Sequence, residues 1–324
     1  MTSPKDWVSA ALLASKDLKT LAQTSRTLFA TRLARMMRLT GAASEEAMLA
    51  DPATTWPRLK RSRSVKHTPH NHHLFLSAAV AAFKHVPGLA DAHPDAGAAW
   101  GELQRDNWRA IGERYKDNEP SERQKTALVP FAEVLKARDA LPRGHMTKLL
   151  LLFYTAIPPA RGGDYHALRI HTGDTDTNTD PAANYLLLPA KGRCQLVLQT
   201  FKTSKRYGTI THVLPKEICQ EVRASLRMHP REHVFGPFTR SGFSAWANRA
   251  LKKQLGKAVT ITMLRHLYVS QLDFNHLTLR ELEEVSKQMG HKASMQAQYK
   301  WTDASTKTAE DDTKSSRSPQ RTKL

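Results

Sequence analysis

The spacing of apolar residues changes twice along this chain of 324 residues. Most segments repeat apolar residues at the interval of one helical face, as between residues 16 and 39 and between 129 and 156. Between Arg169 and Pro215, short apolar runs at 185–188, 195–198 and 209–213 are typical of β-strands instead. Helical spacing returns from Lys216. The pattern predicts a mainly α protein with a small β-meander embedded in helices, which is an α+β fold class.

A polar break interrupts the helical spacing at residues 116–121, and a chain of this length can bury two cores. We therefore expect a helical domain over residues 1–117, a linker over 118–128 and a second domain over 129–302. Residues 303–324 are rich in Ser, Thr, Lys and Arg and lack apolar anchors, which predicts a flexible basic tail.

The charge balance favours a polyanionic partner. Lysine and arginine total 49 against 30 acidic residues, a formal net charge of +19, and nucleic acid is the simplest partner for such an excess. A basic protein with a solvated surface is the alternative. The candidate DNA-binding residues are Arg26, Arg32 and Arg35 in the first helical stretch, Arg61 and Arg63 in the basic segment after it, and Lys205 further along. An ordinary amphipathic surface helix explains the first three equally well.

Other classes of protein receive little support. Cys194 and Cys219 form no CxxC pair, which argues against a zinc ribbon or a disulfide framework. The segment with His67, His70, His72 and His73 has no nearby cysteine, so a basic DNA-contacting segment is favoured over a metal site. We expect no metal and no cofactor. No apolar run approaches the ~20 residues of a membrane span, and a secretion signal is missing. A soluble intracellular protein without membrane attachment is expected.

Three separated motifs carry the chemistry. The first, Pro158 to Tyr165, puts Arg161 at a turn into a helix with Asp164 three residues later, a spacing that lets the carboxylate orient the guanidinium. The second, 262–270, contains Arg265. The third is Met289-Gly290-His291, followed eight residues later by Tyr299. Each motif alone is commonplace, whereas their order and spacing together are not.

Taken together, these motifs resemble the catalytic domain of the tyrosine recombinase, or phage-integrase, family over about the last 190 residues. The Pro-Pro-x-Arg start and the Gly-His to Tyr spacing look most like integrases of eukaryotic mobile elements and large DNA viruses. The resemblance implies a tyrosine-recombinase catalytic domain preceded by a helical domain that closes over DNA. It also implies site-specific DNA breakage and rejoining, with four subunits acting on two DNA sites.

The resemblance assigns a role to each residue, and the chemistry explains why its type is needed. Arg161 and Arg265 would grip the scissile phosphate, because a guanidinium is planar, bidentate and permanently charged. Tyr299 would attack phosphorus. His291 would bind the phosphate or assist proton movement. A hairpin lysine would protonate the leaving oxygen; Lys202 aligns best, and Lys205 is a close competitor.

One position departs from the family pattern. Three residues before the second arginine the family commonly has histidine, and this chain has Thr262. Its hydroxyl can donate a hydrogen bond but cannot act as a base at neutral pH. His266, directly after the arginine, is expected to buttress the site.

Two alternatives to a recombinase stay open. The first is an enzyme like type IB topoisomerases, which use similar chemistry on one duplex. The second is a non-catalytic DNA-binding protein derived from an integrase. The threonine at position 262, where the family commonly has histidine, is the feature that favours this alternative. In each case the protein would associate with double-stranded DNA inside the cell, in the nucleus if the host is eukaryotic.

Overall fold

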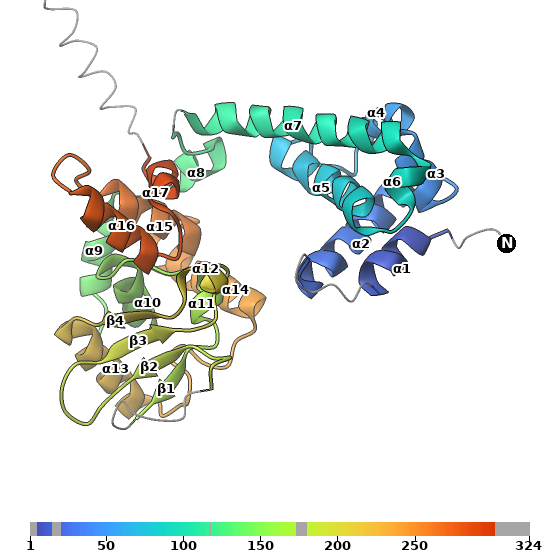
Figure 1. Cartoon of the computed structure of the whole chain (residues 1–324). Coiled ribbons are helices and arrows are strands. Elements are labelled where there is room, and N and C mark those ends of the chain that lie inside the picture. Colours follow the sequence, from blue (N-terminus) through green and yellow to red (C-terminus); the bar gives the residue numbers. More distant parts are fainter. Residues whose placement is uncertain (1–4, 15–20, 117, 173–179, 302–324) are drawn as a thin grey trace, which may run out of the picture. The chain divides into compact units, whose positions relative to one another are not determined.

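The computed structural model describes residues 5–14, 21–116, 118–172 and 180–301. The chain divides into two compact units, Met1–Asp117 and Asn118–Leu324, and each is described here by itself (Figure 1). The tail predicted over 303–324 lies outside the described residues.

All the regular secondary structure among the described residues of the first unit is helical. Proline begins three of its helices, and the preceding residue caps the first two of these: Asp51 accepts from the amide of Thr54, and Thr68 accepts from the amide of Asn71. The helices are α1 (Trp7–Ala14), α2 (Gln23–Thr40), α3 (Glu45–Ala50), α4 (Pro52–Arg61), α5 (Pro69–His85), α6 (Leu89–Ala92) and α7 (Pro94–Lys116).

The core of the first unit forms where α5 packs against α2 and α7. Leu33 and Met36 of α2, Phe75 of α5 and Trp100 of α7 are fully buried in one cluster. The indole N–H of Trp100 donates to the carbonyl of Leu49 at 2.8 Å, so the largest buried side chain also has its polar group satisfied.

The second unit combines helices with one small sheet. Its helices are α8 (Glu122–Ala127), α9 (Phe131–Asp139), α10 (Met146–Thr155), α11 (Gly162–Tyr165), α12 (Ser204–Tyr207), α13 (Lys216–Met228), α14 (Arg240–Leu255), α15 (Ile261–Ser270), α16 (Leu279–Gln288) and α17 (Ala293–Tyr299). Its core is built around α10, whose residues from Leu149 to Thr155 are all buried and which packs against α9, α13, α14 and α15.

The sheet has the order β1-β2-β3-β4, formed by β1 (Arg169–His171), β2 (Tyr185–Leu187), β3 (Gln195–Leu198) and β4 (Ile210–Val213). The last three strands are antiparallel neighbours, as in a meander, whereas β1 pairs with β2 in parallel. The connection between β3 and β4 presents residues 199–209 at one end of the sheet. The predicted class, mainly α with a small β element, is confirmed.

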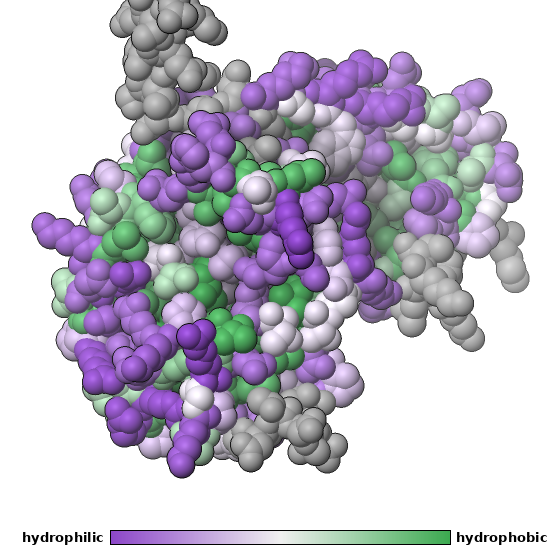
Figure 2. All heavy atoms as spheres, turned by 60° about the vertical axis from the view of Figure 1, so that its left-hand side comes forward, coloured by the Kyte–Doolittle hydropathy of each residue, from purple (hydrophilic) through white to green (hydrophobic). Residues whose placement is uncertain are grey.

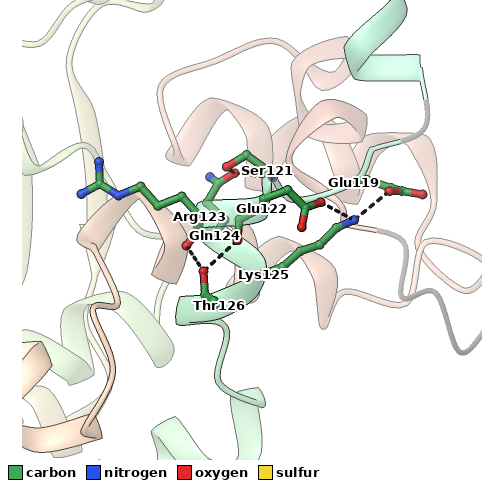
Figure 3. A network of polar contacts seen from close by, with 7 residues as sticks. All are labelled: Glu119, Ser121, Glu122, Arg123, Gln124, Lys125 and Thr126. Atoms are coloured by element: carbon green, nitrogen blue, oxygen red, sulfur yellow. Dashed lines mark hydrogen bonds and ion pairs between the residues drawn. The ribbon is translucent and has the colours of Figure 1, made fainter.

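The segment 118–128, expected to be a linker, contains a helix. Gln124 caps α8 by accepting from the backbone amide and hydroxyl of Ser121, and Lys125 lies 3.3 Å from Glu119 and 3.1 Å from Glu122 (Figure 3). Exposed ion pairs of this kind contribute little stability. Ala127, the last residue of the helix, is buried in the core of the second unit.

The surface of the second unit is mixed in character. On the face seen in Figure 2, hydrophilic residues dominate, with smaller apolar areas between them. No helix among the described residues has both the length and the hydropathy that crossing a membrane would need.

Candidate active site

Arg265 is a charged residue of the second unit that is only 3% exposed. It lies on α15, whose residues Ile261, Leu264 and Leu267 anchor the helix in the core. Its Nη2 donates to the carbonyl of Met289 at 3.4 Å, whereas Nε and Nη1 have no hydrogen-bond partner among the described residues. Buried donors without partners cost free energy, so this position is suited to an anion that would accept from them.

Arg161 lies at the turn that the two prolines predict, directly before α11. The carboxylate of Asp164 accepts from the backbone amide of Arg161 at 3.0 Å. The expectation that it orients the guanidinium directly is therefore wrong: Asp164 shapes the turn. Burial raises the pKa of Asp164, opposed by the Arg161 amide and by the charges of Arg161, Arg265 and Arg240.

Gly290 ties three segments of the second unit together. Its carbonyl accepts from Nη1 of Arg161 at 3.1 Å and from the hydroxyl of Thr203 at 2.8 Å. Its φ of +71° lies in the left-handed region, and an added Cβ would come within 3.4 Å of both Arg161 and Phe201. Glycine is needed here both for its backbone freedom and for the close approach of the arginine.

His291 lies behind the two arginines and is 4% exposed. Its Nδ1 is 3.4 Å from Nη2 of Arg265, and its Nε2 is hydrogen-bonded to Oε1 of Gln296. Burial lowers the pKa of His291 to about 4; the Gln296 contact opposes this shift, and the charges of Arg265 and Arg161 add to it. The ring is therefore neutral at physiological pH.

Tyr299 ends α17 with its ring held on several sides. The ring stacks against His291 at a centroid distance of 5.0 Å, lies 4.6 Å from His266, and has the Arg265 guanidinium 5.3 Å above it. Nδ1 of His266 donates to the carbonyl of Tyr299 at 2.9 Å, and the other ring neighbour of His266 is Trp301, stacked at 4.4 Å. His266 therefore lies behind the tyrosine, where a buttress is expected.

Several of these residues line one cavity of about 430 Å³. Of the five predicted catalytic residues, four line it, namely Arg161, Lys202, Arg265 and Tyr299, and His291 does not. Thr262 and Asp164 also line it. Lys202 is exposed and follows the buried Phe201 in the β3–β4 connection, whereas Lys205 lies on α12 and is not among the lining residues. The structure thus brings the two arginines, the phenol and Lys202 to a single pocket.

Sequence reasoning missed four residues of this region, three on α14 and one on α17. Arg240, Ser244 and Asn248 lie four residues apart on α14 and line the pocket together, which makes Arg240 its third arginine. The i, i+4, i+8 spacing was a visible signal, but it is common on solvated helix faces. Gln296 is fully buried beside His291, and no local pattern marks it.

The basic candidates of the first unit fare differently from one another. Arg26 is 1% exposed, and its Nε donates to the carbonyl of Leu21, so the expectation that it meets phosphates is wrong. Arg32 and Arg35 are half-buried over the ring of Phe75, at 5.6 and 5.7 Å. Arg61 and Arg63 are exposed. The last four can present charge to a polyanion.

The histidine-rich segment forms contacts with itself and its surroundings. Nδ1 of His67 lies 3.3 Å from Nε2 of His72, and His73 packs on Trp108 with a centroid distance of 4.3 Å. Within the described residues, no group of three or more His, Cys, Asp or Glu side chains is placed to hold a metal ion.

The low pKa of His291 predicts a loss of stability in acid. Unfolding returns this histidine to its ordinary pKa near 6.5, so between about pH 6.5 and 4 the unfolded chain binds a proton that the folded chain does not. The free energy of unfolding should therefore fall over this window by up to about 3 kcal/mol from His291. Denaturant unfolding of the full chain at pH 7 and pH 4.5 measures the fall, and His291→Asn should show a fall smaller by about 2 kcal/mol. An equal fall in both proteins would contradict the assignment.

Comparisons with known proteins add little. No protein-family model matches the sequence, and no curated protein matches it. Among solved structures, the crystal structure of XerA recombinase resembles this chain with a TM-score of 0.40 and 10% sequence identity, over 97% of this chain and 100% of that one. We infer nothing about this chain from a likeness at that level.

Proposed function

We propose that this chain is a site-specific DNA recombinase or integrase that cuts and rejoins DNA through a 3′-phosphotyrosine at Tyr299. One observation carries the proposal: Arg265 is buried with two donor nitrogens that have no hydrogen-bond partner in the described part of the chain, on a pocket also lined by Arg161, Lys202 and Tyr299. A phosphodiester supplies the anionic acceptors that these donors need, and the phenol supplies a nucleophile.

The arrangement fits phosphoryl transfer step by step. Guanidinium groups on the non-bridging oxygens stabilise the added negative charge of the transition state. The Tyr299 oxygen forms a bond to phosphorus, its proton passes to water, and the bond from phosphorus to the 5′-oxygen breaks. Lys202 gives that oxygen its proton. A 5′-hydroxyl of the partner strand then attacks the phosphotyrosine in the reverse sense. The energy of the phosphodiester is kept in the adduct, so the reaction consumes no nucleotide. In this proposal the two arginines supply the positive charge that a metal ion would otherwise supply.

The wider assembly follows from the same proposal. Strand exchange between two sites would need four copies of the chain on two duplexes, and the basic residues of both units would hold the DNA backbone. With a net charge of +19, binding should weaken steeply as salt is added, because phosphate contacts release counterions. A DNA-associated location inside the cell belongs to this proposal.

The test is to trap and map the covalent intermediate. Full-length protein is incubated with a pool of nicked suicide duplexes of randomised sequence, in which the released 5′-end diffuses away. We expect a protein–DNA adduct whose linked peptide contains Tyr299. Binding without any adduct would leave a non-catalytic DNA-binding protein. An adduct together with relaxation of supercoiled plasmid lacking a selected site would favour the topoisomerase alternative.

Lys202 should act as the proton donor to the leaving oxygen, rather than Lys205. Lys202→Ala is expected to slow cleavage by about 10²–10⁴-fold, the usual contribution of a general acid. Sulfur in place of the bridging 5′-oxygen leaves readily without a proton, so this substrate should restore the variant to within roughly tenfold of the wild type. Lys205→Ala is the matched control and should cleave both substrates normally. A loss in Lys202→Ala that persists with the sulfur substrate would rule out the assigned role.

A further inference from the structure

A chain of contacts runs from the pocket into the core through Arg265, His291 and Gln296. His291 stands between the other two, with Nδ1 toward Arg265 Nη2 at 3.4 Å and Nε2 toward Gln296 Oε1. Gln296 is fully buried on α17, and its amide nitrogen lies 3.6 Å from the sulfur of Met289. Contacts with His291 at the amide oxygen and with Met289 at the amide nitrogen therefore fix the orientation of the Gln296 side chain.

The donors in this chain decide where the proton of His291 lies. A guanidinium can only donate hydrogen bonds, so Nδ1 of His291 must carry a lone pair toward Arg265. In a neutral imidazole the proton is then on Nε2, which needs an acceptor. The carbonyl oxygen of Gln296 is that acceptor. A protonated His291 would instead point an N–H at the guanidinium, and the two like charges would repel.

We propose that Gln296 is a positioning residue: it holds His291 in the neutral Nε2–H form, so that Nδ1 fixes the guanidinium of Arg265. This inference rests on the proposed function, because a fixed Arg265 guanidinium matters only if it binds the scissile phosphate. It also changes the role expected of His291. With both ring nitrogens occupied and the side chain off the pocket wall, His291 orients the arginine and transfers no proton.

The groups that face His291 support a permanently neutral ring. Arg265 approaches from α15 and Arg161 from the turn before α11, and both bring positive charge. From α17 come the neutral amide of Gln296 and the ring of Tyr299. No acidic group appears among the causes of the lowered pKa of His291. A carboxylate placed at position 296 would therefore be the strongest single perturbation of the proton on this ring.

Gln296→Glu tests the proposal, with Gln298→Glu as the matched control because Gln298 is exposed on the same helix. A carboxylate still accepts from Nε2–H but stabilises the imidazolium, so His291 should titrate near or above its ordinary pKa of about 6.5. Cleavage by Gln296→Glu should then fall at least tenfold between pH 8.5 and pH 5.5 and approach the wild-type rate at pH 8.5. The wild type and Gln298→Glu should show no such fall. A Gln296→Glu profile parallel to that of the control would overturn the proposal.

A second measurement needs no activity and separates this inference from the proposed function. Nitrogen-15 shifts of His291 in the wild type at pH 7 should show the neutral Nε2–H tautomer, and in Gln296→Glu at pH 5.5 they should show the imidazolium. The Nδ1–H tautomer or an imidazolium in the wild type would overturn the inference even if the protein cuts DNA. A wild type that forms no adduct but shows the expected tautomer would refute the proposed function and leave the tautomer assignment standing.

Discussion

Tyr299→Phe should form no covalent adduct with a suicide duplex, a loss on the order of 10⁴-fold or more, because removal of the nucleophile leaves no route to the intermediate. The change deletes one oxygen and keeps the ring. The contacts that the ring makes with His266, His291 and Arg265 do not involve the hydroxyl and should survive. DNA binding should therefore stay near the wild-type level while cleavage disappears. Adduct is measured by gel shift after denaturation, and binding by a mobility assay on intact duplex.

Tyr207→Phe is the matched control for this variant. Tyr207 ends α12 in the same unit, is partly buried against the core and is not among the residues lining the pocket. It should form adduct at the wild-type rate. If Tyr299→Phe still formed an adduct, another residue would be the nucleophile, and the proposed role of Tyr299 would be refuted whatever the other variants did.

Patterns that depend on near neighbours in the chain were readable before the structure. The helical spacing before Ala156 matches α10, and the three short apolar runs match β2, β3 and β4 to within a residue or two. The order Arg161, Arg265, Tyr299 also identified residues that line one pocket. Apolar periodicity is readable because it is a local property of the chain. The order of the motifs is readable because it needs only the sequence and the family pattern that it resembles.

Partners chosen by the tertiary fold were not readable. The parallel pairing of β1 with β2 depends on how the intervening chain crosses over. Arg26 looks like its exposed neighbours in sequence, yet it lies on the buried side of α2. Asp164 has the spacing to meet the guanidinium of Arg161 but accepts from its backbone amide. In each case several partners satisfied the same local pattern, and packing selected one.

The sequence also did not reveal the importance of Gln296, which supports the site without lining the pocket, or of Arg240. Gln296 contacts His291 because α17 packs against both α15 and α16. Arg240 is one of many arginines in this sequence, and no distinctive local pattern separates it from the others. Motif reasoning finds groups whose chemistry is distinctive, such as a phenol after a Gly-His pair. It does not find a residue such as Gln296, whose side-chain oxygen matters because it accepts the hydrogen bond from one particular N–H of His291.

Arg265→Met should cut cleavage by roughly 10³-fold while leaving the protein at least as stable as the wild type. One preorganised donor to the transition-state charge is typically worth about 3–4 kcal/mol. Methionine fills a similar volume and removes two buried donors that have no hydrogen-bond partner among the described residues. Replacing this buried charge, which forms no ion pair among the described residues, with an apolar side chain should raise the free energy of unfolding by about 1–2 kcal/mol. A loss of activity together with a gain in stability would indicate that the charge of Arg265 serves substrate binding and not the stability of the fold.

The measurements are single-turnover cleavage of a suicide duplex and denaturant unfolding without DNA. Arg249→Met is the matched control, because Arg249 is exposed on α14 and does not line the pocket; it should change neither quantity by more than a small amount. Arg265→Lys should stay impaired despite its charge, since an ammonium cannot present the planar pair of donors that a phosphate accepts. Near-normal cleavage by Arg265→Met would remove the clamp from the proposed mechanism. A marked loss of stability would instead show that the buried guanidinium holds the fold, and the unpartnered donors would then no longer indicate a bound phosphate.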